Sequence, residues 1–229
     1  FMLDTLPLLR RQYPNLVLFG ELFGSPAHTE RLVLDYGLNL LLATPWEQKF
    51  APQLRGYLQG LHACAERLRF YAPTNTHDAG SPTEEFGDPA TATARLAVSA
   101  LLGTGSWGFV QGTEFGLEEH LQFIDPPSAF TAPAEAPYAT LCQWLNQMRE
   151  QHAALRRPGN VHFVDDDHLA MLAAVRTGAD GHRPEFLVLV NLDIDYEQTL
   201  DLDLYEHGFH VLGSLEDPAG AEPDRKSVV

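Results

Sequence analysis

The sequence predicts an α/β protein in which parallel strand–helix units come first and an antiparallel β domain follows. Two observations predict this fold class. Up to about residue 158, continuous apolar runs alternate with amphipathic, helix-like segments, which is the rhythm of βαβ units. Beyond that point the apolar runs are shorter, partly alternate with polar residues and are separated by turn-forming residues. The predicted domains are therefore 1–158 and 159–229.

The first region contains apolar runs that we interpret as strands, at 16–23, 38–45, 70–78 and 106–116. The first two are continuous, which is typical of strands buried on both faces of a sheet. Each run is followed by polar residues at its C-terminal end. In parallel sheets and α/β barrels that edge is where sites are built.

Amphipathic segments between and around these runs predict the helices. They cover 2–14, 28–37, 50–69, 90–105 and 136–159. The first stops at Pro14, the second ends at Gly37, where a left-handed cap costs little, and the last is closed by Pro158 and Gly159. The strands of the second domain are predicted at 161–167, 168–177, 184–195, 198–206 and 209–217.

Composition excludes several function classes. The chain has 45% hydrophobic and 20% charged residues, a globular profile, and its net charge of -16 argues against nucleic acid or an anionic membrane as partner. Cys64 and Cys142 lie far apart, so neither a disulfide framework nor a zinc site is expected, which fits a cytoplasmic location. No apolar run reaches the roughly 18 residues of a membrane span. We predict no metal and no cofactor, and we interpret the acidic stretch 164–168 as a solvated turn.

One acid stands out in the first apolar run. Glu21 lies between two Phe-Gly pairs, and burying an unpaired carboxylate is costly, so the site is either wet or functional. His77 and Asp78 end the third run. Glycoside cleavage needs an acid that protonates the leaving oxygen and a second carboxylate. Carboxylates gathered at the ends of parallel strands suit that chemistry.

The stretches "LVLFGELFG", "FYAPTNTHD" and "GFVQGTEFG", followed by a β domain, resemble the second half of the α-amylase family barrel. The resemblance implies strands five to eight of a TIM (β/α)₈ barrel, followed by a small antiparallel β-sandwich domain. It also implies that Glu21 is the general acid/base, Asp78 the acid that supports the transition state and His77 a sugar-binding residue.

Other polar and aromatic residues near these strand ends are candidates for substrate binding. Asn75 belongs to the same stretch as the His-Asp pair, Trp46 with Glu47 follows the second run, and Gln111 with Glu114 follows the fourth. Trp46, Glu47, Gln111 and Glu114 have an alternative interpretation as wall or loop-packing residues, and the sequence leaves both open.

The sequence departs from the family at the nucleophile. The family's fourth strand ends in Gly-x-Arg-x-Asp, and no stretch of that form is present. The nearest candidate is Asp4, but Met2 stands where the motif requires arginine. A full barrel takes about 250 residues, so we expect the nucleophile upstream of Phe1.

The resemblance implies a retaining α-glucan-active enzyme that hydrolyses or transglycosylates α-linked glucose, with an α-glucan or maltooligosaccharide as partner. The alternative is a truncated or non-catalytic relative that binds glucan, or a fragment that needs its missing half. A half barrel exposes strand edges, which favours self-association. A further alternative is an unrelated α/β domain.

Overall fold

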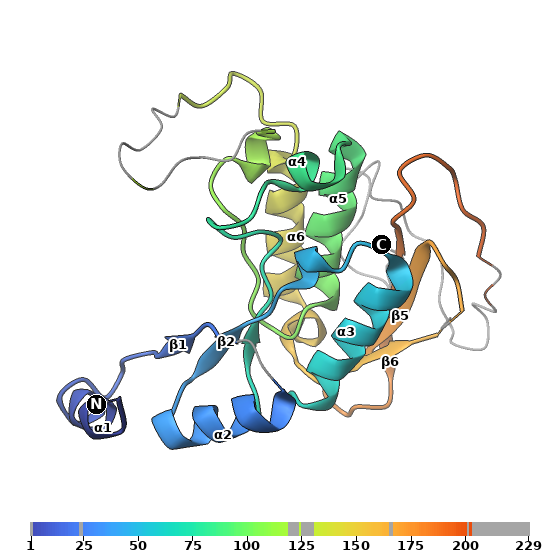
Figure 1. Ribbon diagram of the computed structural model, residues 1–229. Helices are drawn as coiled ribbons and strands as arrows, with labels where there is room; N and C mark the ends of the chain where they lie inside the picture. Colours follow the sequence, from blue (N-terminus) through green and yellow to red (C-terminus); the bar gives the residue numbers. More distant parts are fainter. Residues whose placement is uncertain are drawn as a thin grey trace.

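The computed structural model describes residues 2–22, 25–118, 124, 131–164, 167–200 and 202 (Figure 1). The first strand–helix elements are α1 (Met2–Gln12), β1 (Phe19–Gly20), α2 (Pro26–Tyr36), β2 (Leu40–Leu42), the short 3-10 helix η1 (Pro45–Glu47), α3 (Ala51–Ala63) and β3 (Phe70–Tyr71). They are followed by α4 (Pro82–Phe86), α5 (Pro89–Ala97), the π-helical turn η2 (Val98–Leu102), η3 (Thr113–Phe115), α6 (Ala139–Gln151) and η4 (Ala153–Arg156). The last elements are β4 (Val161–Phe163), β5 (Met171–Thr177) and β6 (Pro184–Asn191).

Strands β1, β2 and β3 form a parallel sheet in the order β1-β2-β3, as the alternating pattern predicted. Phe19 pairs with Leu40, and Leu41 pairs with Phe70. The predicted fourth strand is reduced to a parallel bridge between Tyr71 and Ser106. The pairing continues for a short distance, since the N–H of Thr74 donates to the carbonyl of Gly108 at 2.9 Å. The strand–helix rhythm is therefore confirmed, although the strands are shorter than the apolar runs.

The first run is not buried on both faces, which corrects the prediction. Val17 is 65% exposed and Phe19 is 50% exposed. The reason is position, because β1 is an edge strand of the described sheet and pairs with β2 alone. β2 lies between two strands, and its Leu41 is only 2% exposed.

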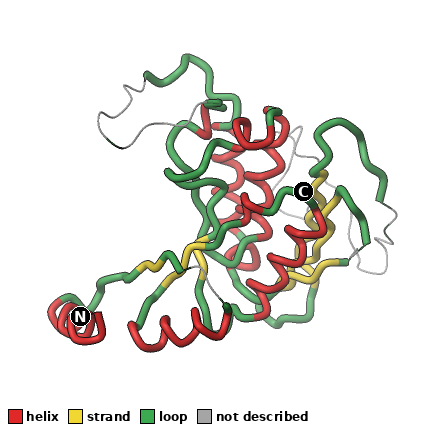
Figure 2. The backbone as a smooth tube through the Cα atoms, viewed as in Figure 1, coloured by secondary structure: helices red, strands yellow, loops and turns green. Residues whose placement is uncertain are grey.

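Local signals set the helix ends. The Ser25 hydroxyl accepts a hydrogen bond from the N–H of His28, and Pro26 occupies the first turn of α2. Gly37 ends the helix with φ 64°, the left-handed conformation that glycine adopts at low cost, as the sequence predicted. In Figure 2, α2 and α3 are helices that alternate with the short parallel strands. None of the helices within the described ranges has the length and apolar character needed to cross a membrane.

Strands β4, β5 and β6 form an antiparallel sheet in the order β4-β5-β6. Every residue of β5 is buried, so this strand does not alternate between buried and exposed positions as the sequence suggested. It is the central strand and packs against α3 and η4 as well as its two neighbours. The predicted strand 209–217 and most of 198–206 lie outside the described residues. The described part of this region forms a single sheet.

One hydrophobic core joins the two predicted domains. It contains Leu54 and Leu58 of α3 and Leu145 of α6, together with Leu172 of β5 and Val188 of β6. All five are at most 1% exposed. The antiparallel sheet is therefore packed on the helices of the first region, and the orientation of α3 and α6 depends on it.

Buried side chains cap the end of η2. The carbonyl oxygens of residues 100, 101, 102, 103 and 105 all accept hydrogen bonds from side chains. The donors are Arg149 to Ala100 and Gly105, Arg176 to Leu101 and Gly103, and His62 to Leu102. A helix leaves its last carbonyls without backbone partners, and a cation is favoured there by the helix dipole. These three donors belong to α6, β5 and α3, so the capped turn joins three elements.

His62 acts in this arrangement as a neutral imidazole. Its Nδ1 accepts the N–H of Gly159 at 3.0 Å, which places the ring proton on Nε2, where it is donated to the Leu102 carbonyl at 2.9 Å. Burial, and then the nearby charge of Arg176, lower the pKa of His62 to about 4. Protonation would require a second N–H at Nδ1, where the Gly159 N–H already points.

Acid should therefore destabilise the protein through His62. The pKa is about 4 when folded and 6.5 for the ordinary group, so the unfolded chain binds more protons between these values. This contribution to stability is complete above pH 6.5 and is lost as the pH falls toward 4, at up to about 1.4 kcal/mol per pH unit. Urea unfolding of the protein and of His62→Gln at several pH values measures it. We expect a shallower acid slope in the variant. Equal slopes in the two proteins would contradict this role.

Candidate functional site

The predicted site residues follow the C-terminal ends of adjacent parallel strands. Glu21 comes directly after β1, Trp46 lies in η1 after β2, and His77 with Asp78 lies in the turns after β3. Because β1, β2 and β3 are parallel neighbours, these segments leave the sheet at the same edge. The structure thus places the candidates on one edge, in the order that the sequence predicted.

Glu21 is exposed at the end of β1. Gly20 is the last residue of the strand and directly precedes Glu21. A Cβ added at Gly20 would lie 2.7 Å from Leu38 Cδ1. Glycine at this position therefore lets the chain ahead of β2 pack closely against the end of β1. The carboxylate is open to solvent. Glu21 is therefore a solvated acid at a strand end, and the cost of burying an unpaired carboxylate does not arise.

The loop after β2 is fixed by hydrogen bonds around Thr44. The hydroxyl of Tyr57 accepts the N–H of Thr44 at 2.7 Å, and burial raises the pKa of this phenol. The Thr44 hydroxyl donates to Glu47 Oε2 at 2.9 Å. Trp46 lies between these contacts and is partly buried. Trp46 therefore lies in a loop in which the residues Thr44 and Glu47, before and after it, are both held by hydrogen bonds.

His77 and Asp78 form an exposed pair. His77 Nε2 lies 3.5 Å from Asp78 Oδ2, and their side chains are 60% and 58% exposed. An imidazole and a carboxylate at this separation offer a donor and an acceptor to one ligand. Both groups are accessible, as a sugar-binding pair must be.

Asn75 is placed differently, since it is only 5% exposed. Its Oδ1 accepts the N–H of Val110 at 3.1 Å and the hydroxyl of Thr113 at 3.2 Å. These bonds tie the end of β3 to the segment after Ser106. In this structure Asn75 positions the neighbouring loop, and its predicted contact with substrate stays a prediction.

Glu114 lies in η3 and is partly buried. Its Oε2 accepts the N–H of Gly112 at 2.8 Å, and Gly112 has φ 108°, a conformation that favours glycine. The charge of Glu114 acts with burial to raise the pKa of the Cys142 thiol to about 11. Gln111, by contrast, is exposed beside this turn. The carboxylate of Glu114 is thus engaged by its own loop.

Asp4, the nearest nucleophile candidate, lies in the first turn of α1 and not at a strand end. Among the described residues, no three His, Cys, Asp or Glu side chains are grouped as a metal site would require. Sequence reasoning missed Thr44 and Tyr57, which position the η1 loop. Their role depends on contacts between residues 13 apart, for which the sequence offers no signal.

No protein-family model matches the sequence. A curated relative is the alpha-1,4-glucan:maltose-1-phosphate maltosyltransferase of Arcanobacterium haemolyticum, 27% identical over 218 residues, which covers 87% of this chain and 31% of the relative. The chain therefore spans about a third of that protein's length.

Two solved structures share the fold over most of the chain. An α-amylase from Geobacillus thermoleovorans, complexed with acarbose, has a TM-score of 0.61 at 15% identity, covering 78% of this chain and 43% of that chain. A cyclic alpha-maltosyl-(1-->6)-maltose hydrolase from Arthrobacter globiformis, in complex with maltose, has a TM-score of 0.58 at 18% identity, covering 77% and 43%.

The parallel strand–helix units thus belong to a fold shared with an α-amylase and a cyclic alpha-maltosyl-(1-->6)-maltose hydrolase. Together with the similarity to the maltosyltransferase, these likenesses support the resemblance of the chain to the α-amylase family of glycoside hydrolases and transglycosylases.

Proposed function

We propose that this chain is part of a retaining α-glucan-active enzyme, which hydrolyses or transglycosylates α-linked glucose. The observation that supports it most is the placement of Glu21, Trp46 and the His77–Asp78 pair after adjacent parallel strands, in the order of the family. The names of the similar proteins, which include a maltosyltransferase and a cyclic alpha-maltosyl-(1-->6)-maltose hydrolase, support an α-glucan or maltooligosaccharide as substrate.

In this proposal, residues 1–158 form strands five to eight of a (β/α)₈ barrel, and residues 159–229 form the β domain. Glu21 protonates the leaving glycosidic oxygen and then, as a carboxylate, removes a proton from the incoming water or sugar hydroxyl. Asp78 supports the charge that develops on the sugar ring, and His77 holds a hydroxyl beside it. The carboxylate that attacks the sugar is supplied by polypeptide outside residues 1–229.

Exposed apolar side chains favour the fragment interpretation over an independent glucan-binding protein. α1 and the chain around β1 expose Leu3, Leu8, Tyr13, Val17 and Phe19, each at least half exposed. An apolar surface of this kind next to an unpaired strand edge is normally covered by other polypeptide. We propose that the preceding barrel strands cover it, and that the isolated chain self-associates there.

The test is the anomeric form of the first product. We expect the longer polypeptide to cleave an α-linked maltooligosaccharide and to release a first product in the α configuration, because a double displacement retains the configuration. NMR spectra recorded before mutarotation identify the anomer. The isolated chain should bind without cleaving. First-formed β product would contradict the retaining mechanism. Binding without cleavage by the longer polypeptide would favour the non-catalytic alternative.

A further inference from the structure

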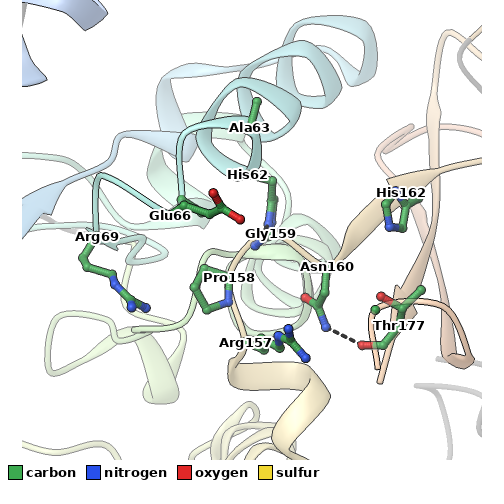
Figure 3. Close-up of a pocket in the computed structure, with 12 residues that line it drawn as sticks. His62, Ala63, Glu66, Arg69, Arg157, Pro158, Gly159, Asn160, His162 and Thr177 are labelled. Carbon is green, nitrogen blue, oxygen red and sulfur yellow. Dashed lines mark hydrogen bonds between the residues drawn. The ribbon is translucent and has the colours of Figure 1, made fainter. Parts of the chain in front are cut away.

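A cavity of about 680 Å³ is lined by none of the candidate glucan-site residues (Figure 3). Its walls come from the end of α3 and the connection to β3, from the segment that enters β4, and from the turn between β5 and β6. Arg69 immediately precedes β3, so the cavity is at the N-terminal end of that strand, whereas His77 and Asp78 follow its C-terminal end. None of the residues that line this cavity has a role in the proposed glucan site.

The cavity is cationic in a chain that is strongly acidic. Arg69 and Arg157 line it, with Glu66 as the one carboxylate among its lining residues. Two arginines against one glutamate give +1 with the histidines neutral, whereas the whole chain carries -16. His162 adds a further titratable nitrogen at the wall. A local excess of positive charge on such a background attracts anions.

The two arginines come from different elements. Arg157 is anchored, because its Nη1 donates to the carbonyls of Gly178, at 3.3 Å, and Ala179. Arg69 is exposed, and its guanidinium has no hydrogen bond or ion pair within the described ranges. Figure 3 shows the two side chains on either side of Pro158. A ligand between them would join the first region to the entry of the antiparallel sheet.

The wall chemistry defines the kind of anion. A guanidinium binds a phosphate through two parallel hydrogen bonds, a geometry that lysine cannot reproduce. The volume exceeds that of a phosphate alone. No phenylalanine, tyrosine or tryptophan lines the cavity, so the large aromatic rings on which nucleobases commonly stack are not among its lining residues. Glu66 and His162 are suited to hydroxyl groups.

We propose that this cavity binds a small phosphate monoester of a polyhydroxy compound. The phosphate lies between Arg69 and Arg157, and a hydroxyl group donates to Glu66. The site is a second ligand site, separate in position from the glucan site. Occupancy would stabilise the contact between the α3–β3 connection and the antiparallel sheet.

The experiment measures binding of glucose 6-phosphate, inorganic phosphate and glucose to the full chain at constant ionic strength, by calorimetry and thermal unfolding. We expect glucose 6-phosphate to bind most tightly and, at ten times its Kd, to raise Tm by about 3–6 °C. Inorganic phosphate should bind more weakly and glucose should leave Tm unchanged.

Arg69→Gln is the informative variant, because Arg69 is exposed and its loss should not disturb folding. We expect at least a tenfold loss of glucose 6-phosphate affinity in it. Arg67→Gln is the matched control: Arg67 is also exposed, lies two residues away, pairs with Glu30 at 3.5 Å and is outside the cavity. It should bind normally. Equal affinities in the two variants, equal binding of glucose, or inorganic phosphate binding as tightly as the ester would overturn the proposal. Glucan cleavage is not the readout, so failure here is distinct from failure of the proposed function.

Discussion

Replacing Glu21 with glutamine in the longer, catalytically competent polypeptide is expected to lower α-glucan turnover by about 10²- to 10⁴-fold, the usual contribution of a general acid/base. Glutamine keeps the shape of the side chain but neither protonates the leaving oxygen nor accepts a proton afterwards. Because Glu21 is exposed at a strand end, we expect the free energy of unfolding to change by less than about 0.5 kcal/mol. Initial rates on maltooligosaccharides and urea unfolding measure the two effects.

A leaving-group comparison separates a catalytic role from a merely structural one. A substrate with an acidic phenol as leaving group needs little protonation, so bond cleavage from it should suffer less in Glu21→Gln than cleavage of a maltooligosaccharide. Asp35→Asn is the matched control, since it removes an exposed carboxylate of the next helix that pairs with Arg31 at 3.5 Å. Near-normal turnover in Glu21→Gln, or equal losses on both substrates, would remove Glu21 from the acid/base role.

Local signals in the sequence predict where α1 and α2 end. Gly37 ends α2 in the left-handed conformation, and Pro14 follows the end of α1, because both effects depend on one residue and its immediate neighbours. The placement of Glu21 and of the His77–Asp78 pair after strands of one parallel sheet is also predictable. It follows from chain order, since parallel strands joined by helices carry their C-terminal ends to one edge.

Burial is predicted less well, because it depends on partners far away in the chain. The run around Val17 is as apolar as the run around Leu41, yet the former is exposed and the latter buried. The difference lies in the number of neighbouring strands and not in composition. Asn75 shows the same limit, since the partners of its side chain lie 35 and 38 residues further along.

Arg176 is the strongest case. In the sequence it is one basic residue in the apolar stretch "LAAVRTG", and a half-exposed strand would place it in water. In the structure it is 0% exposed. Its carbonyl acceptors at Leu101 and Gly103 are 75 and 73 residues away, so no local pattern could identify them.

Arg176→Met should destabilise the protein by about 3–5 kcal/mol, the range expected when one side of a buried polar network is removed. The guanidinium donates to the carbonyls of Leu101, Gly103, Ala154 and Arg157 and to Asn160 Oδ1. Within the described part of the chain it forms no ion pair with a carboxylate, so carbonyl oxygens and an amide oxygen alone compensate its charge. Burial lowers the pKa of Arg176 to about 9, with Arg149 adding to the effect. The balance still favours the arginine, because methionine would remove a donor from each of these oxygens, and only the Ala154 carbonyl has a second one, Asn160 Nδ2 at 2.9 Å, among the side-chain donors that the structure describes.

Urea unfolding compares the variant with two others. Arg176→Lys keeps the charge, but its ammonium has three donors and a single nitrogen, so it cannot reach both η2 and η4 and should show an intermediate loss. Arg183→Met removes an exposed arginine near the same hairpin and should change stability by less than about 0.5 kcal/mol. If Arg176→Met were as stable as the parent, the buried oxygens would have to bind water or other donors. The capped turn would then not be what joins α3, α6 and β5.

A large loss of unfolding free energy in Arg176→Met and not in Arg183→Met would indicate that this side chain holds the antiparallel sheet to the helices. That attachment would explain why one core contains residues of both predicted domains.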